Sequence, residues 1–303
     1  MRIVFMGTPD FAVPCLKALI NNGHEVTMCV TKPDMPVGRK QILTAPPVKN
    51  IALENNIKVF QPTTLKNEEA FKIISNEKPD AIIVVAYGKI LPKNILDIPK
   101  FGCINVHASL LPNLRGASPI QWSIVTDAKE TGVTTMLMDE GLDTGDMLLT
   151  AKTPIYEEDN AESLHDRLSS LGSKLIIETL DGLLSNSIIP QKQPNDNTSY
   201  APIINKEMGK LDFNKPAREL FNLIRAFNPW PCCYFIHNNK RIKVLSSKVA
   251  DKSNFEAGTV QIIDNKPYVT CGDGLMLELE EICPEGSKKM SGSSAVAGRI
   301  FNN

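Results

Sequence analysis

The chain has 303 residues, of which 42% are hydrophobic and 22% charged, and its formal net charge is −1. This composition is typical of a globular protein with a full-sized core, and the length favours two domains. The first residues predict a buried strand and not a signal peptide, and the longest apolar run, 81–87, is far below the roughly 20 residues of a membrane helix. We therefore expect a cytoplasmic protein with no membrane partner.

The cysteines and histidines argue against a disulfide framework and against a metal site. The seven cysteines are odd in number and scattered, and none forms a Cys-x-x-Cys pair. The four histidines form no His-x-x-x-His pattern. Reduced thiols and the absence of a metal cofactor are therefore the predictions.

In chain order, the first part of the sequence alternates short segments rich in Val, Ile and Phe with segments of helical pattern. Strands are predicted at 3–5, 25–31, 58–60, 81–86, 103–106 and 132–136. Helices are predicted at 11–22, 47–55, 68–76, 118–127 and 160–184. Strands that alternate with helices form βαβ units, so we expect an α/β fold with a doubly wound, mostly parallel, Rossmann-like sheet.

A polar stretch with several prolines, 186–205, follows the long helix and predicts an extended linker. Beyond it, one helix at 216–227 precedes short strand-like segments that are separated by Asn, Asp and Gly turns. These strands are expected at 232–236, 242–249, 258–263, 267–270 and 275–282. The sequence thus predicts a catalytic domain at 1–185, a linker at 186–205 and a smaller β-barrel (OB-like) domain at 206–303.

Charge is distributed unevenly between these parts. Residues 206–303 carry a net charge of +3, the rest of the chain carries −4, and 206–252 alone carries +6. A basic domain suits a polyanionic partner such as a nucleic acid, although a solvated basic face is the alternative. The polar loop expected at 34–41, which contains Arg39 and Lys40, is either an ordinary surface loop or a basic finger that orders on nucleic acid.

For two further segments we expect a structural role and not a ligand-binding one. Gly7-Thr8-Pro9-Asp10 lies where a dinucleotide fold carries its glycine-rich turn, but it lacks the glycines of Gly-x-Gly-x-x-Gly, which argues against NAD. Prolines bracket Trp230 and end the preceding helix. We expect Trp230 to pack in a core, with nucleotide stacking as the alternative.

The strongest chemical signal is an Asn and a His two residues apart at the end of an apolar run. Positions i and i+2 of a strand point to the same face, so Asn105 and His107 can aim into one cleft. Asp143, in the turn Gly141-Leu142-Asp143-Thr144-Gly145, could close on that cleft. A donor, an acid/base and an orienting group suit acyl transfer without a covalent intermediate. The alternative is a set of satisfied polar groups in a core.

Motifs along the whole chain carry a resemblance to a known family. They lie at 7–12, 84–92, 103–107, 109–112, 132–134, 138–146, 199–202 and 225–231. At these residues the sequence resembles the folate-dependent formyltransferases. The linker and the Phe-Asn-Pro-Trp-Pro motif at 227–231 are most similar to the members that act on charged initiator tRNA.

The resemblance implies that 10-formyltetrahydrofolate is the formyl donor and that the acceptor is the α-amino group of methionine on initiator tRNA. It implies direct attack by the neutral amine, with Asn105 and His107 stabilising the tetrahedral oxyanion. Asp143 would hold His107 and relay a proton to the departing folate nitrogen. The dependence on formylated initiation implies a bacterial cytoplasmic protein, which we expect to be a monomer.

The resemblance also implies where the two substrates bind. Folate would lie along Ser109, Leu110, Leu111 and Pro112, with its pterin near Ile90, Leu91, Asp139, Glu140 and Gly141. Initiator tRNA would meet Arg39 and Lys40 of the finger and the basic second domain at Lys206, Lys210, Arg241 and Lys243. Phosphate contacts of this kind make binding depend on salt.

Two other functions remain open at this point. A sister formyltransferase would act on a small amine such as a ribonucleotide or a sugar nucleotide, and it would not need a basic second domain. A non-catalytic RNA-binding protein on the same fold would not need the Asn105, His107 and Asp143 trio.

Overall fold

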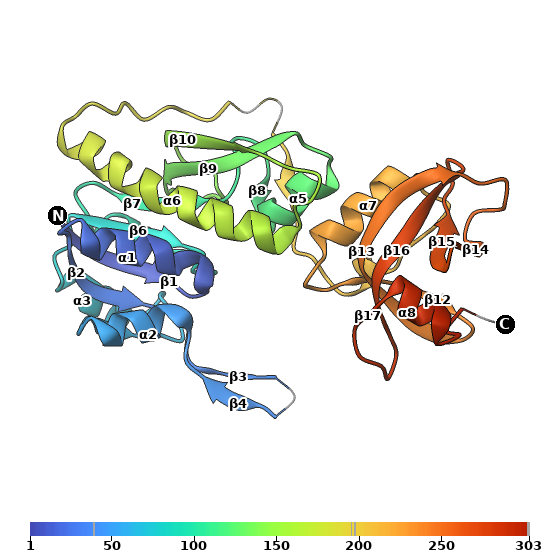
Figure 1. Ribbon diagram of the computed structural model, residues 1–303. Coiled ribbons are helices and arrows are strands. Elements are labelled where there is room, and N and C mark those ends of the chain that lie inside the picture. Colours follow the sequence, from blue (N-terminus) through green and yellow to red (C-terminus); the bar gives the residue numbers. More distant parts are fainter. Residues whose placement is uncertain (39, 195, 197, 302–303) are drawn as a thin grey trace. The chain divides into compact units, whose positions relative to one another are not determined.

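A computed structural model describes residues 1–38, 40–194, 196 and 198–301, which form two compact units (Figure 1). Unit 1 consists of Met1–Gly116, Thr131–Thr153 and His165–Tyr200, and unit 2 consists of Ala117–Glu130, Pro154–Leu164 and the chain from Ala201 onward. The chain thus passes between the units several times. The domain boundaries predicted from the sequence, 1–185, 186–205 and 206–303, stay a prediction.

Unit 1 is built on a seven-stranded sheet in the order β10-β9-β7-β6-β1-β2-β5. The strands are β1 Arg2–Gly7, β2 Glu25–Val30, β5 Lys58–Phe60, β6 Ala81–Val85, β7 Cys103–His107, β9 Glu130–Leu137 and β10 Met147–Pro154. The five strands from β7 to β5 are parallel, and β9 runs antiparallel to β7. The α/β prediction is confirmed, whereas β10 had no counterpart in the predicted strands.

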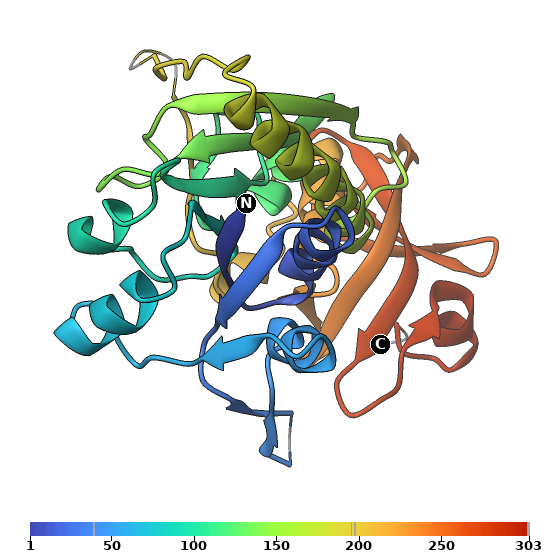
Figure 2. The same ribbon diagram turned by 90° about the vertical axis from the view of Figure 1, so that its left-hand side faces the viewer.

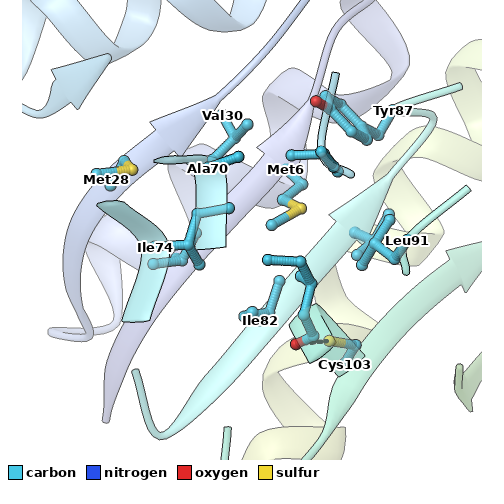
Figure 3. Close-up of a cluster of buried hydrophobic side chains, with 13 residues drawn as sticks. Met6, Met28, Val30, Ala70, Ile74, Ile82, Tyr87, Leu91 and Cys103 are labelled. Carbon is cyan, nitrogen blue, oxygen red and sulfur yellow. Dashed lines mark hydrogen bonds between the residues drawn. The ribbon is translucent and has the colours of Figure 1, made fainter. Parts of the chain in front are cut away.

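Helices cover both faces of this sheet, as expected for strands that are apolar on both sides. They are α1 Val13–Asn21, α2 Pro47–Glu54, α3 Glu68–Ser75, α4 Lys93–Leu96 and the long α6 Ala161–Leu184. Helices α1 and α6 lie on one face (Figure 1), where Gly172 of α6 sits against Val106 and Val133. The other face holds a cluster in which Ile74 of α3 and Leu91 pack on β1 and β6 (Figure 3).

Local sequence signals explain where several helices begin. The side chain of Asn67 accepts a hydrogen bond from the backbone N–H of Ala70 at 3.0 Å and caps α3, and two glutamates follow in its first turn. Proline stands in the first turn of α1, α2 and the helix α5 (Pro119–Val125), where a missing N–H costs nothing. These caps place the helices before any tertiary contact is considered.

The strand order changes direction between β1 and β6, because β2 and β5 follow on one side of β1 and β7 on the other side of β6. In open α/β sheets, ligands bind outside the carboxyl ends of the strands at such a switch point. The register pairs Val84 of β6 with Asn105 of β7. The fold therefore brings the Asn105 and His107 strand next to the expected binding edge.

The segment predicted as a polar loop at 34–41 is largely a β-hairpin. Strands β3 Met35–Val37 and β4 Ile42–Thr44 pair antiparallel, and both are exposed along their whole length. In both views the hairpin projects away from the sheet of unit 1 (Figures 1 and 2). The short apolar runs on either side of the Gly38 turn form the paired strands of the hairpin. The prediction of a polar loop did not include these strands. Arg39 lies outside the described residues, and Lys40 is exposed in the turn.

Unit 2 contains an antiparallel sheet in the order β12-β13-β16-β15-β14, with β17 added beside β16. Its strands are β12 Cys233–His237, β13 Lys240–Lys252, β14 Val260–Ile263, β15 Lys266–Thr270, β16 Leu275–Pro284 and β17 Met290–Ser291. The pairing of β13 with β16 shows several register shifts, and irregularities of this kind allow a strand to bend. Helices α5 Pro119–Val125, α7 Ala217–Ala226 and α8 Gly292–Ala297 complete the unit. The prediction of a β-rich C-terminal part is confirmed.

A network of charged and polar side chains fastens α7 within unit 2. Arg218 donates to Asp127 at 2.6 and 3.0 Å and pairs with Glu157, and Asn222 donates to the same Asp127 oxygen at 3.0 Å. The buried Arg225 donates to the backbone carbonyls of Tyr156 and Asp159. The hydrogen bond from Arg218 holds the pKa of Asp127 well below its ordinary value.

The end of the predicted linker and the Trp230 loop both differ from the expectation. β8 Arg115–Gly116 pairs with β11 Tyr200–Ala201, so the end of the linker is a strand. Trp230 is 52% exposed, so the expectation that it packs in a core is wrong. The loop of Asn228–Pro231 presents its ring to solvent instead.

Candidate active site

Strand β7 presents Asn105 and His107 on the same face, as the two-residue spacing predicted. Cys103, Ile104 and Val106 are buried in the layers on both sides of the sheet. Asn105 is half-buried, and His107 is only 6% exposed. The apolar neighbours therefore fix the strand, and the two polar side chains take their direction from it.

The hydrogen bonds of His107 define what each ring nitrogen can do. Its Nε2 lies 3.0 Å from the carbonyl oxygen of Leu114, and because a carbonyl only accepts, Nε2 carries a hydrogen and donates it. Nδ1 faces the Oδ2 atom of Asp143 at 3.8 Å. Nδ1 is therefore the ring nitrogen through which His107 can exchange a proton or stabilise an oxyanion.

Asp143 reaches this pair from the loop after β9. Its Oδ2 atom accepts a 2.8 Å hydrogen bond from the backbone N–H of Gly116, and its Oδ1 atom lies 3.5 Å from Nδ2 of Asn105. The backbone of Asp143 is left-handed, with φ of +53°, an uncommon conformation for a residue with a side chain. The structure thus brings together the three residues that the sequence pattern singled out.

A close backbone approach explains one glycine of this loop. A Cβ atom on Gly145 would lie 1.8 Å from the carbonyl oxygen of Leu137, the last residue of β9. No side chain fits at that distance, so the turn that returns the chain from Asp143 to β10 requires glycine here.

The residues expected to bind folate fall into two groups along β9. Ser109 and Leu111 contact Thr134 in the middle of this strand: Thr134 donates to the carbonyl of Ser109 at 2.7 Å and accepts from the N–H of Leu111 at 3.1 Å. Pro112 and the half-buried Leu110 belong to the same loop. The Ser109 hydroxyl donates to the carbonyl of Asn113 at 2.7 Å and is thus used within the loop.

The second group lies at the C-terminal end of β9 and in the loop that follows it. Leu91 is 2% exposed and belongs to the core cluster on which Met138 also packs, whereas Ile90 is 77% exposed. Leu91 therefore presents no side chain to a ligand, and any contact from it comes through its backbone. The side chain of Asp139 shapes its own loop by accepting from the Gly141 N–H and from Thr144, while Glu140 is exposed.

Three of the four basic residues expected in the C-terminal domain lie around one strand pair of unit 2. The register places Lys243 opposite Tyr234, and Lys210 forms a bridge with Tyr234 on the other side. Arg241 stacks over the ring of Tyr234 at 3.5 Å, and among the described residues its Nε has no hydrogen-bond partner. Lys206 lies just before the short helical turn Glu207–Gly209. We call Lys210, Tyr234, Arg241 and Lys243 the basic face.

Sequence reasoning missed two residues beside the trio. Gln193 lies in the segment predicted as a linker, yet it is buried and contacts the Asp143 loop. Arg115 donates to Gln193 at 2.9 Å. Neither residue carries a local signal, since both contacts join segments far apart in the sequence.

Comparison with known proteins places the chain in a family. The formyl transferase model matches residues 1–180, and the model of the formyl transferase C-terminal domain matches 203–299. The methionyl-tRNA formyltransferase of Caldanaerobacter subterraneus is 49% identical over 96% of this chain and 94% of the relative. The chain belongs to the methionyl-tRNA formyltransferase family. The protein of the same name from Bacillus subtilis is 46% identical over 98% of this chain and 94% of its own.

Solved structures agree on the fold. A sugar 3N-formyl transferase crystallised with dTDP and 5-N-formyl-THF aligns with a TM-score of 0.69 at 23% identity, over 95% of this chain and 99% of that chain. The resemblance to the folate-dependent formyltransferases is confirmed, as is the prediction of a transferase with an α/β domain and an antiparallel one.

Within the described ranges, no group of three His, Cys, Asp or Glu side chains is placed to hold a metal ion. Among the helices described, none combines the length and apolar character needed to cross a bilayer.

Proposed function

We propose that this protein transfers the formyl group of 10-formyltetrahydrofolate to the α-amino group of methionyl initiator tRNA. The relatives named methionyl-tRNA formyltransferase at 46–49% identity support the reaction. The single observation that carries the chemistry is the convergence of Asn105, His107 and Asp143 around one point. The products would be formylmethionyl-tRNA and tetrahydrofolate.

In this reaction the neutral amine of methionine attacks the formyl carbon, and a new C–N bond forms. The carbonyl oxygen becomes an oxyanion of a tetrahedral intermediate, which then collapses as the bond to N10 of the folate breaks. One proton leaves the attacking amine and one reaches N10, so the transfer needs an acid/base group but no external oxidant or cofactor. The trio supplies this group and the oxyanion donors.

The geometry supports a division of roles among the three residues. Asn105 Nδ2 lies 3.5 Å from Asp143, a long contact that leaves the amide free to turn toward an oxyanion. His107 would act through Nδ1, because Nε2 donates to Leu114. Asp143, held by Gly116, would accept the amine proton and pass it toward N10, directly or through water.

The folate would contact two loops beside β9, at Ser109–Pro112 and Asp139–Gly141, together with Ile90. The structural neighbour crystallised with 5-N-formyl-THF supports a folate donor of this class. The 10-formyl form is proposed because its N10 leaving group matches the acid/base arrangement of the trio. We also propose that the reaction at this site uses no metal ion.

The tRNA would meet the β3–β4 hairpin and the basic face. Lys40 lies in the hairpin turn, and the basic face presents cations beside an aromatic ring, a combination that binds nucleic acid without requiring base readout. Arg39, next to Lys40 in the sequence, is proposed to contact the tRNA with it. Because formylmethionine starts bacterial translation, we propose that the protein acts in the bacterial cytoplasm and as a monomer.

A small-amine acceptor is the second candidate, because the structural neighbour named above is a sugar formyltransferase. The experiment that separates the two uses a 10-formyltetrahydrofolate donor with a labelled formyl group. Charged initiator tRNA, uncharged tRNA, free methionine and a dTDP-amino sugar are offered in parallel. Label on charged tRNA alone is expected, whereas label on the sugar nucleotide alone would overturn the proposed acceptor.

A further inference from the structure

Gln193 is a buried amide in a segment that has little regular structure around it. It lies between α6 and β11, and the residue is 9% exposed. The backbone of its neighbour Gln191 is fixed on both sides by reciprocal 2.8 Å hydrogen bonds with Met147 at the start of β10. The segment therefore delivers the Gln193 side chain to a defined place in unit 1.

The amide nitrogen of Gln193 holds the Asp143 loop by its backbone. Nε2 donates to the carbonyl of Asp143 at 2.9 Å and to the carbonyl of Gly145 at 2.8 Å. Both of its hydrogens are thus used on two carbonyls that flank Thr144. Because the Asp143 backbone has a positive φ, its conformation needs support from outside the loop, and these two bonds supply it.

The amide oxygen of Gln193 contacts strand β8. Oε1 accepts a 2.9 Å hydrogen bond from Nε of Arg115. Arg115 stands between Leu114, whose carbonyl accepts from His107, and Gly116, whose N–H donates to Asp143. A carbonyl pair on one side and a guanidinium on the other leave only one orientation of the amide that satisfies every contact.

We propose that Gln193 is a positioning residue for formyl transfer, which sets the Asp143 carboxylate relative to His107. It does so by joining the loop that carries Asp143 to segment 114–116. The backbone of that segment forms hydrogen bonds with the side chains of His107 and Asp143. This inference rests on the proposed function of the site. Gln193 acts through Asp143 and the backbone, so it is not a catalytic residue.

The size of the effect follows from the geometry of catalysis. A displacement of about 1 Å at a reacting group can cost on the order of 100-fold in rate. We therefore expect Gln193→Met, which keeps the length of the side chain and removes all three hydrogen bonds, to lower kcat about 10- to 100-fold. The KM for 10-formyltetrahydrofolate should change by less than about 3-fold, because Gln193 binds the carbonyls of Asp143 and Gly145, which follow the proposed pterin contacts at Asp139–Gly141 along the loop.

Gln193→Glu separates the two halves of the contact. A carboxylate still accepts from Arg115, but it places an oxygen against the carbonyls of Asp143 and Gly145. At neutral pH its kcat should be no higher than that of Gln193→Met. As the pH falls and the carboxyl takes up a proton that it can donate, the ratio of its kcat to that of the wild type should rise. A purely structural role would not produce this dependence.

Gln191→Met is the matched control, since Gln191 is exposed two residues away and, among the described residues, forms hydrogen bonds through its backbone alone. The experiment measures kcat, KM and the pH profile of all four proteins on charged initiator tRNA, with Tm as the check on folding. Wild-type kcat in Gln193→Met, or a reduction that Gln191→Met shares, would overturn the inference.

A second measurement keeps the inference independent of the proposed function. If the wild type transfers no formyl group to tRNA, the proposed function fails, and amide hydrogen exchange of residues 143–146 then tests Gln193 alone. We expect faster exchange of this loop in Gln193→Met than in Gln191→Met. Equal exchange in the two variants would refute the positioning role.

Discussion

The carboxylate of Asp143 is oriented by the backbone N–H of Gly116, at a distance of 2.8 Å. The carboxylate oxygen that accepts this hydrogen bond, Oδ2, lies 3.8 Å from Nδ1 of His107. Gly116 is part of β8, which is paired with β11, and its N–H holds the carboxylate close to the imidazole without occupying the other oxygen. The functional consequences of this arrangement can be tested residue by residue.

Removing either proposed oxyanion donor should slow the chemical step more than it weakens binding. Asn105→Ala and His107→Ala are each expected to lower kcat by about 10²–10³-fold, because a preorganised donor acts mainly in the transition state. The Kd for the folate, measured by fluorescence titration, should stay within about 3-fold. Equal reductions in kcat and in folate affinity would remove Asn105 and His107 from the catalytic roles.

Asp143→Asn tests the charge at that position with little change in shape. The asparagine oxygen can still accept from Gly116, so the loop and the Tm should be preserved. Without a carboxylate, the amine proton has no acceptor beside His107, and kcat should fall at least about 100-fold. Single-turnover kinetics on charged tRNA measure this step, and near-wild-type rates would exclude Asp143 as the proton relay.

Gly145→Ala should destabilise unit 1. The added Cβ would lie 1.8 Å from the Leu137 carbonyl, so the end of β9 or the loop must move. A cost of about 3 kcal/mol is expected, at the upper end of the range for overpacking. Gly298→Ala is the control, because its φ is negative and its nearest contact is 3.3 Å. Denaturant unfolding should distinguish the two, and similar unfolding midpoints would contradict this role of Gly145.

The basic face should contribute to tRNA affinity through interactions with phosphates. Arg241→Met together with Lys243→Met is expected to weaken binding and to reduce the slope of log K against log salt by about 1 for each phosphate interaction that the substitutions remove. Lys266→Met in the same unit is the control, because Lys266 is already paired with Glu278 at 2.7 Å. Folate binding should not change in any of these variants. An unaltered salt slope in the double variant would show that tRNA does not use this face.

The Asp127 and Arg218 pair predicts a specific acid sensitivity. The folded-state pKa of Asp127 is lowered by Arg218, so its stabilisation is present above the unfolded pKa of about 3.9 and is lost as pH falls through the folded value. Because the Asp127 side chain is 38% exposed, solvent screening limits the pair to about 1 kcal/mol. Arg218→Met should therefore lower stability at pH 7 and flatten its decline below pH 4. A decline as steep as that of the wild type would assign the effect to other carboxyls.

The sequence by itself determined the features that depend on local pattern. Alternating strand and helix periodicity predicted the α/β sheet, and the i, i+2 spacing placed Asn105 and His107 on one face, because strand geometry fixes that relation within three residues. The positions of α3 and α7 also followed from local patterns in the sequence. The β3–β4 hairpin was predictable in principle from its two apolar runs around Gly38, but charge in the turn obscured it.

Only the tertiary structure decided which distant groups complete the site. Gly116 meets Asp143 across 27 residues, Gln193 meets Asp143 across 50 and Arg115 across 78. The exposure of Trp230 and the stacking of Arg241 on Tyr234 were also decided by the tertiary structure alone. Such contacts depend on how strands and loops pack after the chain has folded, and backbone carbonyls and N–H groups carry half of them. Since every residue has these backbone groups, no pattern of side chains in the sequence identifies the ones that the site uses.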